Sequence, residues 1–192
     1  MSFCIGLKLI VLLSVKVEKA SYDDFYLEVA PMKSQPSSTS LEGKVFVVEG
    51  GDLSQVDDEL RVTCTIALEI QQAIRNEIGL SASCGVAKSK LLARLASPIN
   101  KPNALTVVPH CVALSFLHSH PITKIPKLQA KLGREVCRLL DIRTVGELSK
   151  VPKANIHKNF GNSTSSAFLI ELGQGKIYEE VKEKVTPKTL IS

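Results

Sequence analysis

The sequence predicts an α+β fold in which a β-sheet with packed helices is followed by a small all-helical domain. Three observations lead to this prediction: apolar alternation in residues 15–30, a helical apolar period in residues 60–78, and short helices separated by tight turns after Pro109. The chain has 192 residues, of which 44% are hydrophobic and 22% charged. This is enough for one core and a small second domain.

The first elements follow from local patterns. Residues 15–30 are rich in Val, Tyr, Phe and Leu, so we expect one or two strands with a bend near residues 21–23. A Ser- and Pro-rich loop covers residues 31–43, and a short strand is expected at residues 44–48. Apolar residues then recur at helical spacing over residues 60–78, and Gly79 provides a C-cap for this helix.

A β–α–β unit is expected next. Small residues at 80–86 predict a strand that a helix or ligand can approach closely. A helix is expected from about Lys88 to Ala96, and a strand from Leu105 to Val108. The first domain then covers residues 1–108.

The second domain is expected at residues 109–180, with a linker at 181–192. A helix is expected over residues 133–140, and Thr144 and Glu147 fit a capping box that opens another short helix. At the other end of the chain, the apolar run Leu7–Val15 is too short and interrupted to span a membrane, which favours a buried strand or helix end over a signal peptide.

Charge is distributed unevenly along the chain. Residues 1–87 have a balance of −5, whereas residues 88–158 hold 13 basic and 3 acidic side chains, a balance of +10. This arrangement suits a protein that holds cations in one place and a polyanion beside it, although a solvated basic surface explains it equally well. The five cysteines are scattered, which indicates reduced thiols packed as small hydrophobes.

Two segments could carry chemistry. In the first, Glu18–Glu28, the neighbouring carboxylates Asp23 and Asp24 interrupt an apolar strand-forming run. Two acids at a bend can share Mg²⁺ ions, but surface Asp–Asp pairs are common, so a solvated pair stays open. The second, Ser83–Asn103, places cations around a strand, a helix and a turn, where they could hold phosphates or form an ordinary basic face.

In order along the chain, these segments resemble the Y-family (translesion) DNA polymerases, closest to the polymerase eta branch. Glu18–Glu28 follows the family's palm pattern E-x-A-S-x-D-E-x-(Y/F)-x-D, and Ser83–Pro102 follows its S-x-G-I-A-x-N-K-x-L-A-K-x-A-S motif and Lys-Pro pair. Pro121–Ile125 and Leu140–Leu148 follow its thumb. The resemblance implies a partial polymerase palm followed by a helical thumb that binds the DNA backbone.

The resemblance also implies roles for individual residues. Asp23 and Asp24 match the catalytic, metal-binding acids, although the family has Glu at the second position. Lys101 matches the lysine that binds the triphosphate of the incoming nucleotide, and Ser21 matches a supporting polar residue. In the thumb, Lys131, Gly133 and Arg134 are the expected DNA-binding residues, although the preceding turn, residues 128–131, lacks two of the family's glycines.

These implications define a working hypothesis with two alternatives. We expect a portion of a DNA-directed DNA polymerase for translesion synthesis in DNA repair, which uses two Mg²⁺ ions, deoxynucleoside triphosphates and damaged primer-template DNA in the nucleus. The family's first acidic strand, fingers and little finger have no counterpart in the sequence, so this chain alone is expected to be inactive. The alternatives are a non-catalytic DNA-binding module and a truncated gene product. A clamp protein is a possible further partner, and no membrane association is expected.

Overall fold

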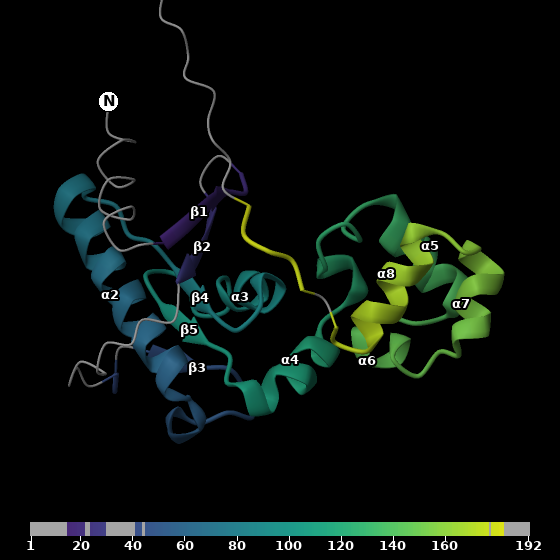
Figure 1. The fold of residues 1–192 in the computed structure, drawn as a ribbon, viewed down its shortest axis with the longest axis horizontal. Helices are drawn as coiled ribbons and strands as arrows, with labels where there is room; N and C mark the ends of the chain where they lie inside the picture. Colours follow the sequence, from purple (N-terminus) through teal and green to yellow (C-terminus); the bar gives the residue numbers. More distant parts are fainter. Residues whose placement is uncertain (1–14, 22–23, 30–40, 44, 177, 183–192) are drawn as a thin grey trace, which may run out of the picture.

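The computed structural model describes residues 15–21, 24–29, 41–43, 45–176 and 178–182, and the observations below concern these residues. Strands and two helices from the first half of the chain lie on one side of the molecule, and the later helices lie on the other (Figure 1). The chain crosses between the two sides near its middle, and its C-terminal described segment runs back toward the first strands.

A β-hairpin forms the start of the described chain. Strand β1 (Val15–Lys19) pairs antiparallel with β2 (Phe25–Val29), which confirms the predicted strands and bend. The turn between them is closed by the backbone N–H groups of Ala20 and Ser21, which both donate to the carbonyl of Asp24, at 2.9 and 3.2 Å. This closure presents the Asp24 side chain at the tip of the hairpin.

A three-stranded parallel sheet lies beside the hairpin, and the most buried of its strands is the central one. Its order is β3 (Val45–Val47), β5 (Leu105–Val107), β4 (Cys84–Val86). Helix α2 (Asp58–Ile78) packs on one face, and α3 (Lys90–Ala96) lies on the other side of β4 and β5 (Figure 1). Gly85 permits this close packing, since a Cβ there would lie 2.0 Å from the carbonyl oxygen of Ala93. The expected β–α–β unit is confirmed.

Helix caps explain where these two helices begin and end. Asp57 accepts a hydrogen bond from the N–H of Leu60 at the start of α2, and Gly79 ends that helix in the left-handed region with φ 73°, as expected. Helix α3 begins about two residues later than expected, because Ser89 is its N-cap and accepts from the N–H of Leu92. In the described part of the chain, no helix is long and apolar enough to cross a membrane.

The strand expected from residue 80 is shorter than predicted and begins at Cys84. Residues 81–83, directly before it, are small and lack the β-branched side chains that favour strand pairing. Their backbone is instead held by a side chain of α2, since Nε2 of Gln71 donates to the carbonyl of Ala82 at 2.8 Å. Pairing with β5 therefore starts at Cys84, after this segment.

The second half is helical, as predicted. Its helices are α4 (Ala113–Ser119), α5 (Lys131–Leu140), α6 (Val145–Leu148), α7 (Lys153–Phe160) and α8 (Thr164–Gly173), with 3-10 turns η2 (His110–Val112) and η3 (Ile122–Lys124). The expected capping box is present, because Thr144 accepts from the N–H of Glu147 while the Glu147 carboxylate accepts from the N–H of Thr144. Nε2 of His118 lies 3.1 Å from the carbonyl of Gly173 and ties α4 to the end of α8.

Two clusters of buried apolar side chains make up the core. The smaller one lies between α2 and the parallel sheet. The larger one joins the two halves of the chain, because it contains residues from β5's end, from α3 and from the helical half; examples are Leu95, Ala96, Val108, Phe116, Ile125, Leu128 and Val136. The two halves therefore share a core across the expected domain boundary at residue 108.

The described cysteines match the expectation of free thiols, but they differ in environment. Cys64 is fully buried, and burial raises the pKa of its thiol to about 12. Cys84 and Cys137 are partly buried, and burial raises the pKa of both thiols. Cys111 is exposed, so it does not pack as a small hydrophobe.

Candidate functional site

The tip of the hairpin carries the first candidate residue that the structure describes. Asp24 is exposed, and its Oδ2 accepts a hydrogen bond of 3.2 Å from the hydroxyl of Ser21, whose Oγ in turn accepts from the N–H of Asp24. Ser21 therefore orients the acid as a supporting residue would. Asp23 lies outside the described residues. Among the described side chains, no group of three His, Cys, Asp or Glu residues could hold a metal. The role of Asp24 as a metal ligand therefore stays a prediction.

The hairpin is joined to α3 by a group of polar side chains that sequence reasoning missed. Nζ of Lys90 lies 2.7 Å from Oε2 of Glu18, and the two side chains are only 11% and 12% exposed. The same ammonium lies 4.5 Å from the centroid of the Tyr26 ring. One turn further along α3, Arg94 donates from Nη1 to the Tyr26 hydroxyl at 2.8 Å. Both basic residues of the helix therefore contact the hairpin.

The sequence contains a pattern that indicates a basic helix face, but it does not indicate which residues that face contacts. Lys90 and Arg94 are four residues apart and so share one helix face, but the sequence offers no sign of which acid or aromatic ring that face meets. Glu18 and Lys90 are 72 residues apart. Their pairing depends on how the hairpin docks, which is a tertiary property.

A second ion pair fixes the loop that leads into α3. Nζ of Lys88 lies 2.9 Å from Oδ2 of Asp57, the N-cap of α2, and 3.7 Å from Oε2 of Glu59. Partial burial raises the pKa of Asp57, but the N–H of Leu60 and the Lys88 ammonium outweigh it and hold this pKa below its usual value. The hydrogen bond to Asp57 raises the pKa of Lys88. Lys88 is therefore held by acids of α2.

Lys101 lies in the turn between α3 and β5, where its side chain is exposed. Asn100 anchors this turn, because its Nδ2 donates to the buried hydroxyl of Thr106 at 3.1 Å. An exposed lysine on an anchored turn can reach an anion. The role of Lys101 in binding the triphosphate stays a prediction.

In the helical half, helix α5 has one buried face and one exposed, basic face. Gly133 is buried, and a Cβ there would lie 1.8 Å from the carbonyl oxygen of Leu128, so glycine allows the turn before α5 to pack against the helix. Lys131 and Arg134 are exposed on the other face, and Arg138, which sequence reasoning missed, follows one turn later. Any contribution of Gly133 to DNA binding would therefore be through the shape of this turn.

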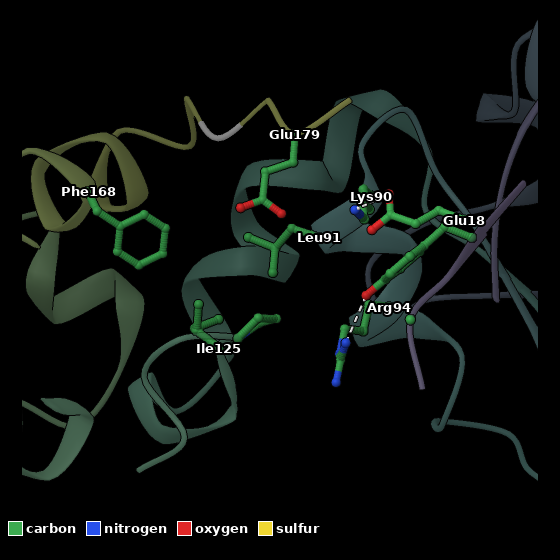
Figure 2. Close-up of a pocket in the computed structure, with 10 residues that line it drawn as sticks. Glu18, Lys90, Leu91, Arg94, Ile125, Phe168 and Glu179 are labelled. Carbon is green, nitrogen blue, oxygen red and sulfur yellow. Dashed lines mark hydrogen bonds and ion pairs between the residues drawn. The ribbon is translucent and has the colours of Figure 1, made fainter. Parts of the chain in front are cut away.

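A pocket of about 190 Å³ lies between the hairpin, α3 and the helical half (Figure 2). Glu18, Lys90 and Arg94 contribute polar groups, while Ile125 and Phe168 line it from the helical side. The pocket thus marks the place where the acidic hairpin faces the second half of the chain.

Two solved structures share this fold over most of the chain. A chimeric Y-family DNA polymerase superposes with a TM-score of 0.68 at 23% identity, over 94% of this chain and 45% of the other. DinB from Sulfolobus solfataricus gives a TM-score of 0.65 at 23% identity, over 94% and 46%. The likeness to these two structures gives the fold of the chain, an α+β half followed by a helical half.

Sequence comparisons give the family. The impB/mucB/samB family matches residues 7–98, and the helix-hairpin-helix motif of DNA polymerase eta and Rev1 matches residues 120–176. DNA polymerase eta of Drosophila melanogaster is 31% identical over 71% of this chain, and that of Arabidopsis thaliana is 33% identical over 72%. DNA polymerase IV of Shewanella woodyi is 32% identical over 83%. The chain belongs to the Y family of DNA polymerases, as the resemblance implied.

The chain spans only a minor part of these relatives. The matches cover 15% of the Drosophila protein, 20% of the Arabidopsis protein and 36% of the Shewanella protein. The activity, substrates and partners of the whole proteins therefore come to this chain as proposals.

Proposed function

We propose that the chain is the palm-and-thumb portion of a template-directed DNA polymerase that copies past damaged bases. The observation that supports this proposal is the docking of the acidic hairpin on α3 through Glu18 and Lys90, with the Asp24 carboxylate on the turn of this hairpin accepting a hydrogen bond from Ser21. In this reaction, the primer 3′-oxygen attacks the α-phosphate of a deoxynucleoside triphosphate, a P–O bond forms, and pyrophosphate leaves.

The roles in the complete site follow from the chemistry of these side chains. Asp23 and Asp24 would hold Mg²⁺, and the ions, when bound, would neutralise charge on the reacting phosphates. Lys101 would bind the triphosphate as a point charge, and Ser21 would keep Asp24 in place through its hydroxyl. The thumb would bind duplex backbone through Lys131 and Arg134, with Gly133 shaping the turn. Damaged primer-template DNA, a clamp protein and a nuclear location complete the proposal.

A chimeric enzyme tests the catalytic part. Residues 15–180 replace the matching segment of an active Y-family relative, and incorporation of a single nucleotide is measured at steady state. Asp23→Ala should abolish turnover, Asp24→Glu should keep or raise it, and Lys101→Ala should mainly raise KM for the nucleotide. Lys16→Ala is the control, because Lys16 lies on the same hairpin and pairs only across its exposed surface with Glu28 at 3.2 Å. Parental turnover in the Asp23→Ala chimera would show that the metal assignment is wrong.

A second candidate, a DNA-binding module without catalysis, is favoured by the exposed basic face of α5, which carries Lys131, Arg134 and Arg138. It predicts salt-sensitive duplex binding by the chain. It also predicts a chimera that binds DNA with parental affinity and incorporates no nucleotide at any Mg²⁺ or Mn²⁺ concentration. Incorporation by the chimera would therefore exclude this alternative.

A further inference from the structure

The segment after α8 returns to the hairpin. Residues 178–182, here called the strap, follow the end of the thumb and run back toward β1 (Figure 1). Glu179 belongs to the strap and lines the pocket between the hairpin and the thumb (Figure 2). The strap is thus placed to contact both halves of the molecule at once.

One end of the strap is held by the thumb. The carboxylate of Glu179 forms an ion pair with Nζ of Lys127, and this ammonium also lies 5.2 Å from the centroid of the Phe168 ring on α8. Lys127 has a backbone φ of 71°, in the region that favours glycine, and the next residue, Leu128, is fully buried. The turn before α5 thus directs a long cation toward the strap.

The other end of the strap is held by the hairpin. The backbone N–H of Lys182 donates to Oε2 of Glu18 at 2.7 Å, and Nζ of Lys90 donates to the same oxygen, also at 2.7 Å. One carboxylate oxygen on β1 therefore receives a hydrogen bond from α3 and another from the strap. Because the Glu18 side chain is only 12% exposed, water competes weakly for this oxygen.

We infer that Glu18 is a positioning residue that couples the acidic hairpin to the thumb through the strap. The path runs from the thumb turn at Lys127, through Glu179 to Lys182, and ends on the strand that leads into the turn of Asp24. A shift of the thumb pulls on Glu18, and its carboxylate transmits the shift to the hairpin relative to α3. The meaning of this coupling for catalysis rests on the proposed function, whereas the coupling itself does not.

Hydrogen exchange of the 192-residue chain tests the coupling without any assay of activity. In Glu179→Gln the ion pair at the thumb end is lost, but no atom of the hairpin is changed. An exposed ion pair changes an opening equilibrium by about 1.5- to 5-fold, so exchange of the strap amides should rise by this factor. The coupling predicts that peptides covering residues 16–29 also exchange faster, by up to about 5-fold.

Two further variants separate coupling from a general loss of stability. The charge-reversed double variant Lys127→Glu with Glu179→Lys re-forms the ion pair and should return hairpin exchange toward the parental rate. Lys88→Met breaks a different exposed ion pair, with Asp57, and should leave the hairpin at the parental rate. The inference is overturned if Glu179→Gln leaves hairpin exchange unchanged, whether or not the strap responds, or if Lys88→Met accelerates the hairpin equally.

Discussion

Replacing Lys90 with methionine should destabilise the protein far more than the same replacement of Lys16 on the hairpin surface. Both lysines pair with a glutamate of the hairpin, at 2.7 and 3.2 Å, but Lys90 is 11% exposed and Lys16 is 62% exposed. Loss of one partner of a buried pair leaves an uncompensated charge and costs about 3–5 kcal/mol. Glu18 keeps the hydrogen bond from the N–H of Lys182, so we expect the lower end of this range, about 3 kcal/mol, for Lys90→Met. An exposed pair contributes about 0–1 kcal/mol, which sets the expectation for Lys16→Met.

Urea unfolding followed by circular dichroism measures both variants against the parent, with the free energy of unfolding taken by linear extrapolation. The double variant Glu18→Leu with Lys90→Met removes both charges and should recover part of the loss, because the stranded carboxylate is gone. The reasoning is refuted if Lys90→Met and Lys16→Met differ by less than about 1 kcal/mol, the upper end for an exposed pair.

Four other substitutions test separate parts of the structure. Lys131→Ala and Arg134→Ala should each weaken duplex binding, measured by fluorescence anisotropy, and lower the salt dependence by about one phosphate contact, while Lys16→Ala should do neither. The parent should bind with a dissociation constant of roughly 10⁻⁴ to 10⁻⁶ M at physiological salt. Gly133→Ala should lower the free energy of unfolding by more than about 1 kcal/mol, because its Cβ would lie 1.8 Å from a backbone carbonyl oxygen. Backbone N–H groups lower the pKa of Glu147, so its stabilising effect is present above roughly pH 4.3 and is lost as pH falls through the lower folded pKa; Glu147→Gln should flatten the fall in Tm over this acid range.

The parts of the fold that sequence predicted are those specified by neighbouring residues. The hairpin follows from alternation within one short segment, the end of α2 from Gly79, and the start of α6 from the box formed by Thr144 and Glu147. Each signal lies within a few residues of the structure that it determines. The strand at Cys84 was placed too early because small residues lack a preference for strand, and a side chain from α2 decides where pairing starts.

The candidate site was only partly predictable for the same reason. Motif positions pointed to Asp24, Ser21 and Lys101 by resemblance, and the structure adds a hydrogen bond between the first two. The contacts that hold the hairpin in place could not be read from the sequence, because Glu18 meets Lys90 across 72 residues and the strap across 164. Such pairings depend on the docked position of whole elements.

The backbone conformation of Lys127 also could not be predicted from the sequence. Lysine gives no sequence signal for a positive φ, yet the turn before α5 requires one there, and Leu128 must be buried next to it. Glycine would relieve the strain but could not reach Glu179. The lysine at this position instead supplies an ammonium that pairs with Glu179 of the strap.

Two kinds of contact, apolar packing and the polar contacts of the strap, therefore join the halves of the molecule, and they should respond differently to mutation. The shared apolar cluster, which includes Leu95, Phe116 and Leu128, resists separation of the halves but is non-directional, so it sets their proximity more than the placement of any one side chain. The strap contributes little burial, but its hydrogen bond to Glu18 has a defined direction. Breaking the Glu179 ion pair should thus change the free energy of unfolding by less than about 1 kcal/mol while still changing hairpin exchange. This combination of a small stability effect and a remote dynamic effect is what distinguishes a positioning contact from a packing contact.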